Sequence, residues 1–155
     1  MHKKQLLIAA LLVTAAGLED GTIKDYNWGL ACQCNVGQLI RELKGMDLIE
    51  FQNLFYAANP ASSTWAVAAE RNPKNPLFVA LEEEFGVTAA ELGHLERLTD
   101  YRVLARDNTL HTLRLISPMQ DPVFPERSME GTRSTVARYM RVWAGFIKEE
   151  LAMAV

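Results

Sequence analysis

Residues 132–152 read TRSTVARYMRVWAGFIKEELA, and this stretch near the end of the chain decides the fold. Its apolar side chains recur at helical spacing, at Val136, Met140, Trp143, Ile147 and Leu151, widened by Tyr139 and Phe146. The charged side chains lie largely outside this stripe. A stripe of this kind predicts a long amphipathic helix that packs one face against a core.

Glycine and proline residues divide the rest of the chain into further helical segments. A first helix ends at Asp20-Gly21, and others are expected at about 35–45, 47–56, 64–70, 77–85 and 88–98. Residues 101–106 allow another helical turn, residues 109–116 alternate partly like a strand, and Pro118, Pro122 and Pro125 predict a loop. We therefore predict an all-α single domain over residues 1–155, with six or seven short helices and at most a minor β element.

Capping patterns and apolar spacing make this expectation specific. Asn35 is placed to cap its helix with Gln38 three residues on, and Thr88 with Glu91 forms a capping box. Ser62 or Ser63 is expected to cap the helix at 64–70. The predicted core contains the side chains with the cleanest one-sided periodicity, Trp143, Met140, Ile147, Leu39, Ile40 and Leu43.

The composition is that of an ordinary globular protein. Apolar residues make up 49% of the 155 residues and charged residues 23%, with a formal net charge of −3. Acidic residues predominate before Arg97 and basic ones from Arg97 to Lys148, but the arginines are dispersed rather than gathered in a tract. A solvated helical face explains such dispersed charge better than a nucleic-acid footprint.

The N-terminus fits two interpretations. Lys3 and Lys4 followed by the apolar run 6–16 are typical of a secretory signal, which would end near residue 17. The same run places Leu7, Ala10, Leu11, Thr14 and Leu18 on one stripe, as in a buried helix. We interpret it as a retained helix of a cytoplasmic protein, with export after signal cleavage as the alternative. The run is shorter than the ~20 residues that span a bilayer, so no membrane partner is expected.

Residues 28–37 read WGLACQCNVG and offer the strongest candidate site. The loop 22–34 is long for a connection between short helices, and it carries Tyr26 and Trp28 without helical periodicity. Free amides at the following helix N-terminus are expected to favour the thiolate of Cys34. We predict that any functional site lies around Tyr26, Trp28, Cys32, Cys34 and Asn35, although packing alone explains the same residues.

Two cysteines do not form a disulfide framework, which agrees with a reducing compartment. No cofactor is expected, and zinc is the one metal that Cys32 and Cys34 suggest, with His94 as a further ligand. A structural zinc site needs four ligands and no second cysteine pair exists. As a nucleophile, Cys34 would need His94 or His111 as its base.

Two helical patterns suggest other functions. Glu91 and His94 have the i, i+3 spacing of carboxylate-bridged di-iron bundles, but no second pair exists, so a solvent-side pair is expected. Residues 77–98 read as helix, Gly86 turn and helix, which loosely matches the helix-turn-helix of DNA-binding repressors. In that arrangement Glu91 and Glu96 would face the phosphates, which disfavours DNA as a partner.

Trp28-Gly29, the cysteine-rich entry into residues 35–39 and residues 91–100 together resemble uncharacterised bacterial helical proteins of unknown function. The resemblance implies no catalytic residue. Because no complete catalytic constellation can be assembled, the sequence favours a non-enzymatic helical module that binds a ligand, a protein partner or a second copy of itself. The alternatives are a helix-turn-helix regulator and a metal-binding or thiol-reactive protein that uses Cys32 and Cys34.

Overall fold

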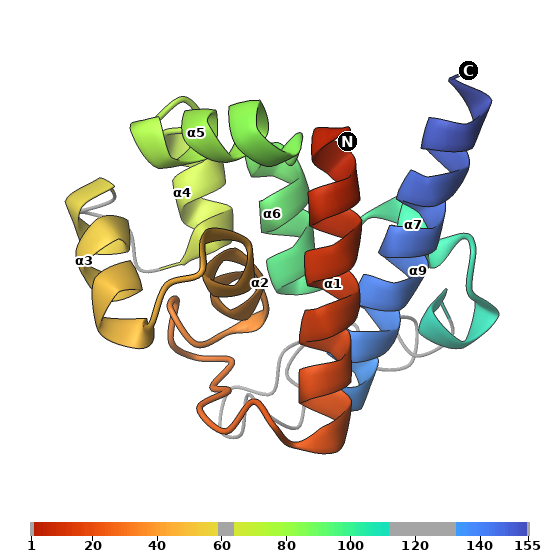
Figure 1. Ribbon diagram of the computed structural model, residues 1–155, viewed down its shortest axis with the longest axis horizontal. Coiled ribbons are helices and arrows are strands. Elements are labelled where there is room, and N and C mark those ends of the chain that lie inside the picture. Colours follow the sequence, from red (N-terminus) through yellow and green to blue (C-terminus); the bar gives the residue numbers. More distant parts are fainter. Residues whose placement is uncertain (1, 59–63, 112–132, 155) are drawn as a thin grey trace.

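The computed structural model describes residues 2–58, 64–111 and 133–154, and within these ranges it is helical without strands (Figure 1). The helices are α1 (Lys3–Asp20), α2 (Asn35–Lys44), α3 (Leu48–Ala58), α4 (Trp65–Arg71), α5 (Pro76–Phe85), α6 (Ala89–Arg97), α7 (Tyr101–Leu104) and α9 (Arg133–Met153). The all-α prediction is confirmed. Residues 108–111 are helical, so the start of the strand-like segment 109–116 is not a strand. The remainder of that segment and the proline-rich loop lie outside the described residues.

Two antiparallel helices, α1 and α9, pack along each other and form one side of the molecule (Figure 1). Helix α2 packs on α1, and α6 packs mainly on α4. Helix α3 lies at the opposite edge and contacts α5. Five of the six predicted core side chains are buried, and Leu43 is only partly so.

A second part of the core is aromatic and holds α3, α4 and α5 together. The Trp65 ring stacks on Phe51 with centroids 5.9 Å apart, and Phe55 lies at 4.7 Å. Phe78 of α5 meets the same indole at 6.0 Å. These rings bury large apolar areas, and Phe51 and Phe55 are the two buried side chains of α3, so they anchor this helix in the core.

Caps end the helices mostly where the sequence predicts. The Thr88–Glu91 capping box is present, and Asn75 caps α5 ahead of Pro76. The predicted serine caps of α4 are wrong, because Thr64 accepts from the amide of Val67 instead. Asn35 is not a cap either: Cys34 occupies that position and Asn35 is the first helical residue. None of the helices described is long and apolar enough to cross a membrane.

Candidate functional site

Tyr26 and Asn35 form the centre of a hydrogen-bond network that fixes the loop 22–34. The Tyr26 hydroxyl donates to Asn35 Oδ1 at 2.7 Å, and Asn35 Nδ2 donates to the carbonyls of Leu95 and Glu96 at 3.1 and 3.3 Å. Because Asn35 is fully buried, its amide joins the loop, α2 and the end of α6. The Arg133 guanidinium lies 5.5 Å from the centre of the Tyr26 ring and donates to the carbonyl of Leu18.

Both cysteines are buried in the turn that precedes α2. The Cys34 thiol donates to the carbonyl of Ala31 at 3.4 Å. Burial raises the pKa of Cys32 to about 11 and that of Cys34 to about 12, although backbone amides of Gly37 and Val36 favour the thiolate of Cys34. The expectation of an acidic Cys34 is therefore wrong, because the loss of water around the sulfur outweighs the helix N-terminus.

The predicted metal ligands do not come together. Among the described residues, no group of three or more His, Cys, Asp or Glu side chains could hold a metal ion. His94 is exposed on α6 and its Nδ1 lies 2.9 Å from Thr99 Oγ1, whereas Cys32 and Cys34 are buried below the loop. A zinc site of the expected composition is not assembled in this part of the chain.

Trp28 is half-buried in the loop, and its indole Nε1 is buried without a hydrogen-bond partner among residues 2–58, 64–111 and 133–154. Neighbouring contacts hold the loop on α2: Asp25 accepts from Gln38 Nε2 at 3.0 Å and pairs with Arg41 at 2.7 Å. Trp65 Nε1 donates to the carbonyl of Ala31 at 2.7 Å. Tyr26 and Asn35 are thus in direct contact and both cysteines are buried beside Asn35 at the start of α2, as in a packed junction, whereas no hydrogen bond or ring contact joins Trp28 to these four residues in the described part of the chain.

Glu96 is a buried acid that the sequence interpretation placed on the wrong side of its helix. Its side chain is only 9% exposed, and its two oxygens accept from the amides of Trp65 at 2.9 Å and Ala66 at 2.8 Å. These are the first two amides of α4, which lack partners within the helix. Burial raises the pKa of Glu96. The carboxylate therefore supports α4 and does not face a polyanion.

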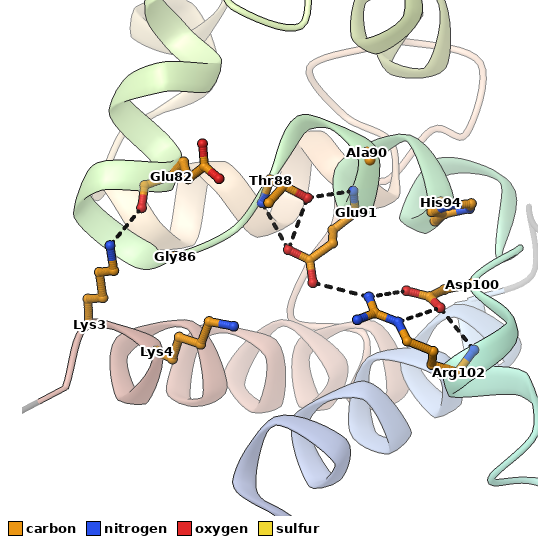
Figure 2. Close-up of a pocket in the computed structure, with 10 residues that line it drawn as sticks. All are labelled: Lys3, Lys4, Glu82, Gly86, Thr88, Ala90, Glu91, His94, Asp100 and Arg102. Atoms are coloured by element: carbon orange, nitrogen blue, oxygen red, sulfur yellow. Dashed lines mark hydrogen bonds and ion pairs between the residues drawn. The ribbon is translucent and has the colours of Figure 1, made fainter. Parts of the chain in front are cut away.

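An open cleft of about 590 Å³ lies where α1, α5, α6 and α7 meet, and sequence reasoning did not find it. Figure 2 shows ten lining residues: Lys3, Lys4, Glu82, Gly86, Thr88, Ala90, Glu91, His94, Asp100 and Arg102. They come from segments far apart in the chain. Only the capping box and the Glu91–His94 spacing were visible in the sequence, and neither pattern reveals that the start of α1 lies beside them.

Most, but not all, of the charged side chains that line the cleft form hydrogen bonds or ion pairs with one another or with the backbone (Figure 2). Asp100 accepts from Arg102 at 2.9 Å, and the pKa of Asp100 is lowered by Arg102 against the opposing effect of burial. Glu91 Oε1 accepts from the amide of Thr88 at 2.9 Å, and Oε2 lies 3.5 Å from Arg102. Lys3 donates to the carbonyl of Glu82 at 3.3 Å.

Two groups are exceptions within the described part of the chain, the exposed carboxylate of Glu82 and the ammonium of Lys4, and Lys4 is the basic one. Its side chain crosses Gly86, whose left-handed backbone, with φ of 71°, ends α5. A Cβ on Gly86 would meet Lys4 Cγ at 2.9 Å, so a glycine here lets the lysine stem pass. The Lys4 ammonium makes no hydrogen bond or ion pair within the described ranges.

Leu98 has a left-handed backbone conformation and precedes the two cleft residues Asp100 and Arg102. Leu98 ends α6 with φ of 53°, a conformation that costs a leucine about 1–2 kcal/mol. Its fully buried side chain offsets that cost, and the turn brings Asp100 and Arg102 over the cleft.

Comparison of the chain with protein-family models, with curated proteins and with solved structures gives no match, so the cleft and the loop are interpreted from their own chemistry.

Proposed function

We propose that this protein is a non-enzymatic module that binds a small anionic ligand in the cleft between α1, α5, α6 and α7. The observation that carries the proposal is Lys4: its ammonium lies in a 590 Å³ cleft with no counter-ion among the described residues. Two of the acidic groups beside it, Glu91 and Asp100, already have partners of their own. A carboxylate or phosphate group on a ligand would supply the missing charge.

We infer a non-enzymatic role because the two side chains of the cleft that could act in catalysis, Thr88 and His94, form hydrogen bonds with other residues and not with each other. The Thr88 hydroxyl lies 3.1 Å from both the amide and Oε1 of Glu91, as part of the capping box. His94 lies beside Thr99 and does not form an activating pair with that hydroxyl. Nucleophilic catalysis needs a base within hydrogen-bond reach of the nucleophile and a third group that orients the base.

Titration of the protein with inorganic phosphate and with citrate, followed by isothermal calorimetry, tests this proposal. We expect binding that weakens as salt is added, because the attraction is between partly exposed charges. Lys4→Gln should reduce the affinity about tenfold, which is about 1.4 kcal/mol for a charge-assisted hydrogen bond.

Lys24→Gln is the matched control, because Lys24 is an exposed lysine that follows the C-terminal end of α1, whereas Lys4 lies at its start. It should leave the affinity unchanged, and circular dichroism should show that both variants fold. Equal affinity of the two variants for phosphate and citrate would contradict a site at Lys4.

A further inference from the structure

Arg102 lines the same cleft as Lys4, and one of its guanidinium nitrogens is not used by the protein. Its Nε donates to Asp100 Oδ1 at 3.2 Å. Its Nη2 donates to Asp100 Oδ2 at 2.9 Å and lies 3.5 Å from Glu91 Oε2. The third nitrogen, Nη1, makes no hydrogen bond or ion pair in the part of the chain that the structure describes. The N–H groups of Nη1 are therefore available to a ligand.

Contacts with Asp100 and Phe146 hold the Arg102 guanidinium in one orientation. The buried Asp100 carboxylate binds it along one edge, and its central carbon lies 5.3 Å from the centre of the Phe146 ring of α9. The group is planar and already bound on one edge, so little side-chain freedom is left to lose when Nη1 binds a ligand. The protein thus presents Nη1 in a fixed position.

The Nη1 end of Arg102 and the ammonium of Lys4 point toward each other across the cleft (Figure 2). Figure 2 shows the Lys4 ammonium directed toward Arg102, and the guanidinium nitrogen without a dashed line directed back toward Lys4. One group comes from the first turn of α1 and the other from α7. Both are positively charged donors, so they cannot bond to each other, whereas an acceptor between them would bind both.

Direct hydrogen bonds, and not the overall charge of the cleft, select the ligand. The described lining contains three lysine or arginine side chains and three carboxylates, namely Lys3, Lys4 and Arg102 with Glu82, Glu91 and Asp100. Equal numbers of opposite charges largely cancel at a distance, so the cleft attracts a distant anion only weakly. An anion that accepts from both Lys4 and Arg102 gains two charge-assisted hydrogen bonds.

We propose that Arg102 is the second anchor of the anionic ligand, and that one carboxylate or phosphate group of the ligand bridges Lys4 and Arg102 through two of its oxygens. The bridge rests on the proposed function, because an anion must enter this cleft for either residue to bind it. The bridge also restricts the ligand, because a single-atom anion such as chloride lacks the second oxygen that would reach the other donor.

Calorimetric titration of the full chain with inorganic phosphate tests the bridge. Arg102→Gln should weaken binding about tenfold, the effect of losing one charge-assisted hydrogen bond. Arg102→Lys should also weaken binding, because its single nitrogen cannot bind Asp100 and the ligand as the forked guanidinium does. The lysine keeps a positive charge beside the buried Asp100, so this second variant serves even where Arg102→Gln does not fold.

Arg106→Gln is the matched control. Arg106 also lies over the Phe146 ring, 4.5 Å from its centre, and pairs with Glu149, but it is not among the described residues that line the cleft. Its replacement removes the same charge beside the same ring and should leave the phosphate affinity unchanged. A loss as large as that of Arg102→Gln would show that only the total charge matters and would overturn the bridge.

Competing anions test the requirement for two oxygens. Replacing sodium chloride with sodium acetate at the same ionic strength should weaken phosphate binding, because the acetate carboxylate accepts from the same two donors. Equal phosphate affinity in the two salts would contradict the bridge. Separate titrations with acetate and with phosphate show which of the two groups the cleft prefers.

The outcomes separate the bridge from the proposed function. If Lys4→Gln weakens phosphate binding while Arg102→Gln and Arg102→Lys do not, the anion site stands and the bridge is wrong. If the wild-type protein binds neither phosphate nor acetate, both proposals fail.

Discussion

A single side chain, Glu96, shows how burial changes the meaning of a charged residue. From the sequence, Glu96 is interpreted as an exposed acid on a helix. Only its position next to Leu95 and four residues after Leu92 indicates that it lies at the edge of the buried face. Its partners are two amides about 30 residues earlier in the chain, and no local pattern identifies such a pairing. The difference matters for function, because the acid no longer opposes DNA at that helix surface.

Glu96→Gln should destabilise the protein by about 1–3 kcal/mol, because the amide nitrogen that replaces one oxygen cannot accept from Trp65 or Ala66. Urea unfolding of both proteins near neutral pH measures the difference. Unchanged stability would show that the carboxylate does not cap α4.

The same variant should remove a pH dependence. Burial raises the folded-state pKa of Glu96 above its ordinary value of 4.5, so the folded protein binds the proton more tightly than the unfolded chain. The contribution is greatest below the unfolded pKa and is lost as pH rises through the folded pKa. The stability of wild type relative to Glu96→Gln should therefore fall as the pH is raised from 4.5.

At the scale of elements, the helices were predictable and their environments were not. The apolar spacing in α9 and the capping box of α6 depend on residues within a few positions of each other, and both are confirmed. The turn before α2 is different. Its cysteines were expected to have a thiolate favoured by the helix N-terminus, but burial of both thiols raises their pKa values instead. Apolar spacing in the sequence predicts which face of a helix is buried. It does not predict which other parts of the chain bury the residues just before the helix.

The junction between the loop and α2 depends on Gly37. A Cβ there would lie 2.5 Å from the carbonyl carbon of Cys32 and 2.6 Å from the carbonyl oxygen of Ala31, and both neighbours are backbone. Gly37→Ala should therefore destabilise the protein by about 1–3 kcal/mol, the usual result of overpacking. Thermal unfolding followed by circular dichroism measures the change.

Gly145→Ala in α9 is the control for Gly37→Ala, because a Cβ there meets nothing within 4 Å. Alanine suits a helix interior better than glycine, so this variant should gain about 0.5–1 kcal/mol. Equal effects of the two alanines would mean that the loop does not pack on α2 as described.

At the scale of the whole molecule, α1 belongs to the core. Leu7, Ile8 and Leu11 are buried by at least 97%, and most of their element's contacts are with α9. The sequence indicated a buried stripe in this segment but not its partner, because the pairing of the first helix with the last is non-local. The cleft is hidden from sequence for the same reason, since it forms only where α1 meets α6 and α7.

Removal of residues 2–16 should abolish cooperative unfolding. Each buried leucine or isoleucine contributes about 2–5 kcal/mol, and the loss of several exceeds the 5–15 kcal/mol that stabilises a typical domain. Near-ultraviolet circular dichroism and calorimetry measure the loss of packed structure. Removal of residues 154–155 is the control and should leave the transition in place. A truncated chain that unfolds at the wild-type temperature would instead favour a cleaved signal.

The bond from Glu96 to the start of α4 also determines how the native protein opens. Helix α4 has seven residues, too few for a helix that is stable alone. The N-terminus of such a helix ordinarily frays, and its first amides then exchange their protons rapidly with solvent. Here those amides are held by α6, which Asn35 in turn holds to α2. We therefore expect the amides of Trp65 and Ala66 to exchange slowly for the start of so short a helix, because either amide is released only when the Glu96 side chain leaves α4.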